Sequence, residues 1–547
     1  MINLNKKNII ISLAVIVFGL AAILRLWQLG KIPVSMSDDE TRLTYSAYSI
    51  WETGRDINNR MLPLTFPISG YAFNPVPIYL TSPFVGILGL SMFSARLPFA
   101  LAGILSVVLL YLIAELLFKE KFIALFSAAV LTFSAWHLQL SRFAYEGGIA
   151  LFFYLLAIYF FLRVKRNKYP ALTVALISLV LAFYSYSGYK LTFVPLVLVL
   201  VWYKLRDINL KQLLVIFSAV VFAFALFFYL GKTQGALTYG GNLFFFQDKA
   251  AMETAVELER RASRAPEKLK EIYHNKLTYV WNIFIHRYEY AFSPQYLFSD
   301  QEESGIFSLW GRGQMYYVDA LLIFLGAVYL ILKKRKEFYL IISFLLIAPL
   351  PSGLGPEPVN YTIRSGFMLP GLVILAGAGL YSLGFFIANR KILLAAGVVM
   401  TVIYLYFIGG YLTQYYFDWG RYSAVYYAKT DQDLAYFLLQ EKNNREKIIV
   451  TGFQPMTLLH FVFYDKLPPQ SLQNNPEARE LSFGNISFVR KCPDLILTDP
   501  RLIIPKNSLY LVPAGCIGKN IPNEAPHRYD RILKSPDGIS EWYIYST

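Results

Sequence analysis

Eleven apolar runs constrain this sequence more than any other feature. A bilayer core about 30 Å thick is crossed by a helix of about 20 apolar residues. The runs therefore predict a polytopic α-helical membrane protein with about eleven transmembrane helices. They are Ile9–Leu29, Ala95–Phe118, Phe122–Leu140, Gly148–Leu162, Pro170–Phe183, Leu191–Tyr203, Leu213–Gly231, Tyr317–Leu332, Phe338–Leu350, Gly366–Ala388 and Ile392–Leu412.

Basic residues gather in every second connection between these runs. The segments concerned hold 17 Lys and Arg against three acidic residues. Connections rich in Lys and Arg stay in the cytoplasm, so the N-terminus is predicted inside and, after eleven crossings, the C-terminus outside. Arg25 and the lack of a small-residue cleavage site favour a retained first helix over a signal peptide. The segments are 1–8, 119–121, 163–168, 204–211, 333–337 and 390–391.

Composition narrows the class of protein further. The chain is 56% hydrophobic and 16% charged, which excludes a disordered chain and an ordinary soluble enzyme. Its net charge of +15 is almost wholly the orientation signal, because the tail from residue 413 holds 15 basic and 14 acidic residues. The charge therefore gives no indication of nucleic acid as a partner, and the lipid bilayer is the predicted environment.

Three regions are predicted outside the membrane, and they set the domain organisation. Residues 1–412 form a transmembrane domain with long outer loops at 30–94 and 232–316. The second loop contains an amphipathic, helical stretch at Asp248–Asn275. Residues 413–547 are predicted as a small α/β domain outside the cytoplasm, with a helix at Asp431–Lys442. Its expected strands are Lys447–Gly452, Asp494–Thr498, Ser508–Val512 and Ile539–Tyr545.

An acidic cluster just beyond the first helix is the sharpest polar feature. Asp38, Asp39 and Glu40 are adjacent and follow Ser37. Carboxylates this close repel one another, so a raised pKa or a bound cation or hydroxyl is one interpretation. The other interpretation is a helix N-terminus, where Ser37 caps the backbone and acidic residues suit the first turn.

A few basic residues stand out because the short outer connections are otherwise poor in them. Arg142 lies in LSRFAYEGG, where it suits either a phosphate or a local pair with Glu146. Lys190 ends the turn YSYSGYK, and Arg364 follows the loop 351–362. No phosphate-binding glycine loop or nucleophile elbow occurs in a convincing context. The charge-poor runs favour an enzyme at the outer surface over a transporter.

The residues of these outer segments resemble a known family. The run SDDETRLTYSAYSIWETGRDINNRMLPLTF, then NPVPIYL and SMFSARLPFALAG, is similar to the membrane glycosyltransferases of the C-type fold. The resemblance is closest to the protein O-mannosyltransferases (glycosyltransferase family 39) and their bacterial relatives, including lipid A aminoarabinose transferases. It continues through LSRFAYE, FYSYSGYK and the Arg364 loop, over roughly residues 1–412.

The resemblance implies an inverting transferase of the bacterial plasma membrane that takes a sugar from a polyprenyl-phosphate donor at the outer face. The acidic pair of the family matches Asp39 and Glu40, with Asp38 leaving the register open by one residue. We expect Asp39 to act as base, while Arg142, helped by Lys190 or Arg364, holds the donor phosphate. The acceptor, whether a protein, lipid or glycan hydroxyl, is not indicated, and neither is the sugar.

Other interpretations stay open at this point. A transporter or flippase of a lipid-linked sugar would move the intact lipid, and an oligosaccharyltransferase or ligase would share the architecture. Asp418-Trp419-Gly420 is faintly similar to an oligosaccharyltransferase motif. No metal is obligatory for the reaction, and the residue pattern does not indicate a site for a divalent ion. Cys492 and Cys516 could be bridged or could pack as free thiols.

Overall fold

The computed structural model describes residues 6–68, 71–234, 244–300, 302, 305–356, 359–473, 480–492, 505–516 and 529–547. The chain forms two compact units. Unit 1 comprises Met1–Trp27, Asn74–Val76 and Phe99–Gln414, and unit 2 comprises Gln28–Phe73, Pro77–Pro98 and Tyr415–Thr547. The first outer loop therefore belongs to the same compact unit as the C-terminal tail.

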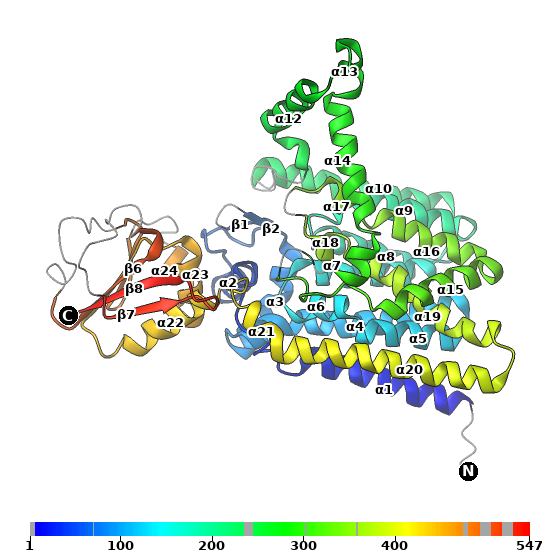
Figure 1. Ribbon diagram of the computed structural model, residues 1–547, viewed down its shortest axis with the longest axis horizontal. Helices are drawn as coiled ribbons and strands as arrows, with labels where there is room; N and C mark the ends of the chain where they lie inside the picture. The colour runs from blue at the N-terminus through cyan, green and yellow to red at the C-terminus, as the bar shows by residue number, and fades with distance from the viewer. Residues whose placement is uncertain are drawn as a thin grey trace. The chain divides into compact units, whose positions relative to one another are not determined.

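Unit 1 is helical, and its long helices other than α14 run roughly parallel to one another (Figure 1). The helices are α1 (Lys6–Leu26), α5 (Lys121–Phe133), α6 (Ala135–Arg142), α7 (Glu146–Leu162), α8 (Pro170–Phe183), α9 (Lys190–Lys204), α10 (Leu210–Thr233), α12 (Lys249–Ala262), α13 (Glu267–Tyr273), α14 (Lys276–Tyr290), α15 (Tyr317–Lys333), α16 (Arg335–Ile347), α17 (Leu350–Leu354), α18 (Tyr361–Arg364), α19 (Leu369–Phe386) and α20 (Arg390–Thr413). Helix α4 (Met92–Phe118) begins in unit 2 and continues here. Short 3-10 or π turns occupy Leu205–Asp207, Phe245–Gln247, Gln295–Ser299, Gly366–Met368 and, where the chain passes from unit 1 to unit 2, Gln414–Asp418.

Each of the eleven predicted apolar runs is helical over most of its length. Among the described residues, six helices are long and apolar enough to cross a membrane, or seven when the bent pair α5–α6 counts as one span. The protein is an integral membrane protein, and the count of eleven crossings stays a prediction. The run Phe122–Leu140 is broken at Ser134, where α5 and α6 meet at 62°. Ser134 is extended and its side chain accepts from the His137 amide, which starts the second helix.

Close helix approaches in unit 1 occur at glycines. Helices α15 and α19 cross where a β-carbon at Gly326 would lie 1.9 Å from the Leu375 carbonyl oxygen. A β-carbon at Gly379 would lie 2.0 Å from the Leu322 carbonyl oxygen. Small residues let backbones approach in lipid, where no hydrophobic force drives helices together. These two positions therefore fix the spacing of the pair.

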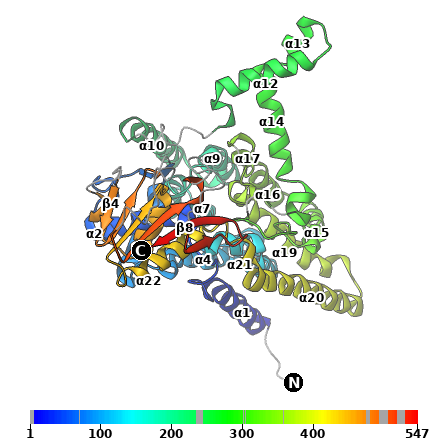
Figure 2. The ribbon, with the colours of Figure 1, turned by 60° about the vertical axis from the view of Figure 1, so that its left-hand side comes forward.

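The long outer loop forms an arm. Helices α12, α13 and α14 project away from the other helices of unit 1 (Figures 1 and 2). The predicted amphipathic stretch Asp248–Asn275 is helical, but it divides into α12 and α13. The division lies at Ser263–Pro266, where Ser263 and Pro266 are extended. Asn275 then caps α14 by accepting from the amides of Leu277 and Thr278.

Unit 2 contains a six-stranded mixed sheet in the order β4-β5-β3-β6-β8-β7. The strands are β3 (Lys447–Thr451), β4 (Glu480–Phe483), β5 (Ile486–Val489), β6 (Ser508–Pro513), β7 (Arg531–Lys534) and β8 (Ser540–Ser546). Helices α21 (Trp419–Tyr422), α22 (Lys429–Glu441), α23 (Pro455–Tyr464) and α24 (Gln470–Gln473) accompany it. Three of the four predicted strands coincide with β3, β6 and β8. The fourth, Asp494–Thr498, lies outside the described residues.

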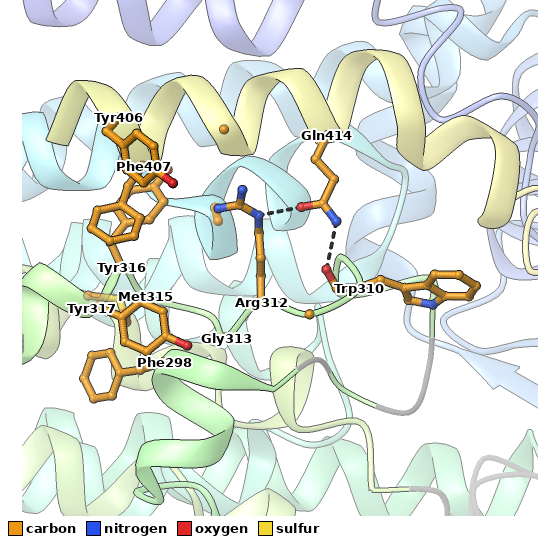
Figure 3. A pocket seen from close by; sticks show the side chains of 13 residues that line it. Phe298, Trp310, Arg312, Gly313, Met315, Tyr316, Tyr317, Tyr406, Phe407 and Gln414 are labelled. Atoms are coloured by element: carbon orange, nitrogen blue, oxygen red, sulfur yellow. Dashed lines mark hydrogen bonds between the residues drawn. The ribbon is translucent and has the colours of Figure 1, made fainter. Parts of the chain in front are cut away.

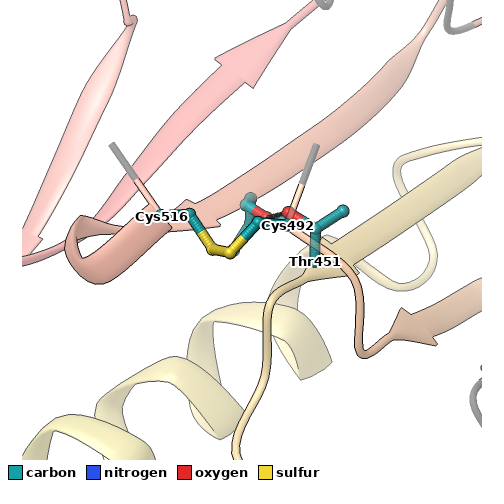
Figure 4. Close-up of a disulfide and its surroundings, with 4 residues drawn as sticks. Thr451, Cys492 and Cys516 are labelled. Atoms are coloured by element: carbon teal, nitrogen blue, oxygen red, sulfur yellow. Dashed lines mark hydrogen bonds between the residues drawn. A yellow bond between two sulfur atoms is a disulfide. The ribbon is translucent and has the colours of Figure 1, made fainter. Parts of the chain in front are cut away.

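Cys492 and Cys516 form a disulfide, which settles the alternative left open above (Figure 4). It lies beside Thr451, whose hydroxyl donates to the Leu511 carbonyl oxygen at 2.9 Å. Gly452 follows with a φ of +59°, and a β-carbon there would lie 2.3 Å from the Cys516 sulfur. The chain therefore requires glycine at this position to pass the bridge.

The first outer loop supplies the rest of unit 2. It contains α2 (Asp38–Thr53), the hairpin β1 (Phe66–Ile68) and β2 (Tyr71–Phe73), and most of α3 (Pro75–Leu88). Tail residues hold α2 along its length. Tyr45 donates to the Leu467 carbonyl oxygen at 3.0 Å, and the Gln473 amide donates to the Ser49 and Thr53 hydroxyls at 3.0 and 2.8 Å.

Candidate functional site

The acidic cluster forms the first turn of α2. Ser37 has extended backbone angles and its hydroxyl accepts from the Glu40 amide at 3.3 Å. The Glu40 carboxylate accepts in return from the Ser37 amide at 3.0 Å. This capping box is what S-D-D-E encodes. The interpretation of the cluster as a helix N-terminus is therefore correct, because its backbone forms the first turn of α2.

Glu40 is held inside unit 2 as one half of a buried ion pair. Its carboxylate accepts from Arg96 Nε at 2.8 Å, and both side chains are fully buried. Arg96 also donates to the carbonyl oxygens of Pro33 and Ser35, at 2.8 and 2.5 Å. Breaking one half of such a pair strands the other charge in a medium that solvates it poorly. Glu40 thus acts by fixing the turn that carries its neighbours.

Asp38 and Asp39 differ from Glu40 in exposure, because their side chains are 47% and 39% exposed. Arg42 donates to one carboxylate oxygen of Asp39 at 3.0 Å. The other oxygen makes no hydrogen bond with any residue that the structure describes. Partial burial of the carboxyl raises the pKa of Asp39, although the charge and hydrogen bond of Arg42 oppose this, and the charges of Asp38 and Glu40 add to the rise. Asp39 therefore offers a free, basic oxygen.

His460 is a functional candidate that the sequence reasoning missed. It lies on α23 in the tail and is fully buried. Its Nε2 lies 3.1 Å from Asp38 Oδ1, and its Nδ1 lies 3.2 Å from the Thr41 hydroxyl. Burial alone would raise the pKa of Asp38, but the hydrogen bond and charge of His460 lower it. No sequence signal announces this contact, because 422 residues separate the two side chains.

Lys190 lies in a polar cluster of unit 1. Its ammonium donates to Asn74 Oδ1 at 2.7 Å, and the Asn74 side-chain amide donates to Glu146 Oε1 at 3.1 Å. The Asn74 backbone amide reaches the same carboxylate oxygen at 2.7 Å. Glu146 begins α7 and Lys190 begins α9. The sequence singled out both residues, but only the fold supplies Asn74 as the bridge.

Arg364 shares a second polar group with Tyr186 and Glu302. Arg364 Nη1 donates to the Pro356 carbonyl oxygen at 2.6 Å, and its charge acts on the Tyr186 hydroxyl and on Glu302. Burial raises the pKa of Glu302 to about 7, against the opposing hydrogen bonds of Thr362. The charge of Glu146 also acts on Tyr186, so this side chain is near both Glu146 and Arg364.

Arg142 is the last residue of α6 in unit 1. Its guanidinium is fully buried and donates to the carbonyl oxygens of Leu24 and Trp27, at 2.7 and 2.8 Å. The i,i+4 geometry considered for Arg142 and Glu146 does not exist, because Phe143 and Tyr145 are extended between α6 and α7. Tyr186 and Glu146 connect Lys190 and Arg364 in one polar neighbourhood. The hydrogen bonds from Arg142 to Leu24 and Trp27 reach the end of α1.

The structure also locates the Asp418-Trp419-Gly420 segment and bears on the question of a metal site. Trp419 of the Asp418-Trp419-Gly420 segment is buried and stacks on Tyr415 with ring centroids 5.0 Å apart. It therefore packs in the core of unit 2. Within the described part of the chain, no group of three His, Cys, Asp or Glu side chains is placed to hold a metal ion.

A family model and solved structures match the chain. Residues 72–230 match the model described as dolichyl-phosphate-mannose-protein mannosyltransferase. This segment contains Asn74, Glu146 and Lys190, the polar cluster described above. No curated protein sequence matches the chain significantly.

Among solved structures, ArnT from Cupriavidus metallidurans bound to undecaprenyl phosphate matches with a TM-score of 0.54 at 13% identity, covering 98% of this chain and 97% of that one. The archaeal oligosaccharyltransferase AglB from Archaeoglobus fulgidus, in complex with an inhibitory peptide and a dolichol-phosphate, gives 0.47 at 14%, covering 84% and 64%. This chain thus spans less than two thirds of the length of AglB. The S. cerevisiae protein O-mannosyltransferase Pmt1-Pmt2 complex bound to the sugar donor gives 0.31 at 20%, covering 45% and 36%.

The match to ArnT extends over nearly the whole of both chains, so it includes the helices and the C-terminal region alike. The family model covers the segment from the end of the first outer loop to α10. The chain has the C-type glycosyltransferase fold that ArnT shares, and residues 72–230 are similar to the protein mannosyltransferase family.

Proposed function

We propose that the protein is an inverting glycosyltransferase that moves a sugar from a polyprenyl-phosphate donor to an acceptor hydroxyl at the outer membrane face. The observation that carries this proposal is Asp39, an accessible carboxylate with one free oxygen and a raised pKa, held in a capped turn. The relation to the protein O-mannosyltransferases and the fold shared with ArnT support the donor class.

In the proposed step, the free oxygen of Asp39 takes the proton of the acceptor hydroxyl. The hydroxyl oxygen forms a bond to the anomeric carbon from the face opposite the phosphate, and the bond from that carbon to the phosphate oxygen breaks. The electron pair leaves with the polyprenyl phosphate, so the anomeric configuration inverts. A positioned base of this kind contributes about 10²–10⁴-fold. Glu40 serves by holding the turn.

The departing phosphate needs positive charge, which Lys190 and Arg364 supply in this proposal. The Asn74 side chain links Lys190 to Glu146, so the carboxylate partly balances the charge of Lys190. The Lys190 amine forms no direct ion pair with Glu146. Arg364 offers a fork of donors suited to phosphate. Arg142, the ligand expected from the family, would have to exchange its carbonyl partners for the phosphate. Preorganised charge on a leaving group contributes about 10²–10³-fold.

The test is Asp39→Asn in purified full-length protein supplied with a panel of radiolabelled polyprenyl-phosphate sugars, mannose first, and membrane extract as acceptor. We expect release of polyprenyl phosphate to fall by at least about 10²-fold. Glu52→Gln, which removes an exposed carboxylate from the same helix, is the matched control. Normal turnover by Asp39→Asn would refute the base assignment. Movement of intact donor across vesicles without release would identify a flippase.

A further inference from the structure

A pocket at the C-terminal end of α20 lies among residues that the proposed reaction does not use. Its volume is about 530 Å³, within the range of small-ligand sites. It lies between the last two turns of α20 and the segment leading into α15 (Figure 3). Both places are predicted at the outer side of the membrane. The pocket therefore opens where lipid headgroups are expected.

The polar end of this pocket is a single, oriented guanidinium. Arg312 Nε lies 2.5 Å from Gln414 Oε1, and Gln414 Nε2 donates to the Trp310 carbonyl oxygen at 2.8 Å. Gln414 is thus fixed at both ends of its amide and holds the Arg312 side chain in place. Figure 3 shows the terminal nitrogens of Arg312 pointing away from Gln414, towards the aromatic side chains of the pocket.

The charge of Arg312 is not neutralised nearby. No carboxylate of any residue that the structure describes forms an ion pair with it. Asp319, the acidic residue at the start of α15, instead accepts from the Tyr316 amide and the Tyr404 hydroxyl. A half-buried cation held by a neutral amide is complementary to an anion. Its planar fork matches the oxygens of a phosphate.

The rest of the pocket is aromatic. Tyr316 and Phe407 stack with ring centroids 6.0 Å apart and form one wall. Tyr317 and Tyr406 are 57% and 76% exposed, and Trp310 is 52% exposed. Exposed Tyr and Trp are typical of the level of lipid headgroups, where one end of each ring meets the acyl chains. An aromatic wall beside a free guanidinium suits a molecule with both a phosphate and an apolar part.

Gly410 on α20 leaves the room that the guanidinium occupies. A β-carbon at this position would lie 2.9 Å from Arg312 Nη2, so a larger residue here would displace the end of the Arg312 side chain. We propose that this pocket binds the phosphate of an outer-leaflet lipid headgroup, with Arg312 as its ligand and the acyl chains along the aromatic wall. This site is independent of the proposed transferase site.

The test measures lipid binding rather than turnover. Delipidated full-length protein in detergent is titrated with phosphatidylglycerol in native mass spectrometry, and diacylglycerol with the same chains serves as the phosphate-free comparison. We expect Arg312→Gln to weaken phosphatidylglycerol binding by about tenfold or more and to leave diacylglycerol binding unchanged. Arg264→Gln, which removes an exposed charge from the same outer loop, should keep the affinity of the original protein.

A second variant keeps the charge and blocks the site. Gly410→Val places methyl groups beside Arg312 Nη2, so phosphatidylglycerol should bind about tenfold more weakly although Arg312 is present. Unchanged phosphatidylglycerol binding by both variants, or an equal loss in Arg264→Gln, would overturn the proposal. Displacement of the lipid by an equal concentration of inorganic phosphate would identify free phosphate as the ligand and also overturn it.

Discussion

The acidic turn of α2 and the basic cluster around Lys190 are both polar groups in an apolar protein, yet they are built in opposite ways. In the acidic turn, the innermost carboxylate is neutralised by Arg96, and its two neighbours are exposed. In the basic cluster, Glu146 is buried and Lys190 is half-buried, and the two share Asn74 as a neutral bridge. Three adjacent acidic residues therefore have three different roles, which their adjacency alone does not reveal.

In both regions, satisfied hydrogen bonds distinguish residues that hold the structure from residues that could react with or bind a substrate. Glu40 is saturated by Arg96 and the Ser37 amide, so it has no oxygen left for a substrate. Asp39 keeps one oxygen free of any described partner. The same criterion ranks Lys190, bound to amide and hydroxyl groups, ahead of Arg142, whose two terminal nitrogens donate to carbonyl oxygens.

The largest expected effect comes from breaking the buried ion pair. Arg96→Met removes the partner of Glu40 and leaves a fully buried carboxylate, which costs about 3–5 kcal/mol. We expect a lower unfolding temperature and poor yield in detergent. The matched control is Arg42→Met, because its ion pair with Asp39 is partly exposed and worth less. Equal losses in the two variants would contradict the distinction between scaffold and exposed pair.

The second effect concerns Lys190. Lys190→Gln keeps a donor to Asn74 but removes the charge, so we expect turnover of a polyprenyl-phosphate donor to fall by about 10²-fold. The unfolding temperature should change little by comparison. Lys276→Gln, an exposed charge on the outer arm, is the control and should retain activity. A fall of the same size in the control would show that general surface charge, rather than Lys190, governs turnover.

The sequence predicted helices well and long-range polar contacts poorly, for a physical reason. Runs of apolar residues dictate helices locally, because every backbone amide in lipid must be bonded within its own segment. The tail strands β3 and β6 were likewise predicted from short runs typical of strands, and β8 from its alternation. The break at Ser134 was missed, since a single capping serine inside an apolar run leaves hydropathy unchanged.

Contacts made by chain segments far apart have no such local signature. The bridges from Asn74 to Glu146 and from His460 to Asp38 join residues 72 and 422 positions apart. Both contacts form only when whole helices pack together, and that packing cannot be predicted from a single sequence. The acidic residues could be singled out from their pattern, whereas the partners that assign their roles could not.

The smallest effect, and the one that tests the tail, is His460→Gln. His460 donates or accepts at Asp38 and Thr41 while facing Asp431, whose pKa is raised by burial. Losing these contacts should cost about 1–3 kcal/mol at neutral pH. Because folding lowers the pKa of Asp38, its contribution to stability is complete above the ordinary value of 3.8 and is lost as pH falls through the folded value.

The unfolding temperatures of the original protein and His460→Gln should therefore differ at pH 7 and converge as the pH falls from 3.8 through the lower folded pKa of Asp38. His460→Asn is a shorter amide that cannot reach both partners, and it should behave in the same way or be less stable. His286→Gln changes a histidine of the outer loop in unit 1 and serves as the control. A constant difference at all pH values would mean that His460 only fills space, whereas convergence would tie the tail to the charge of the acidic turn.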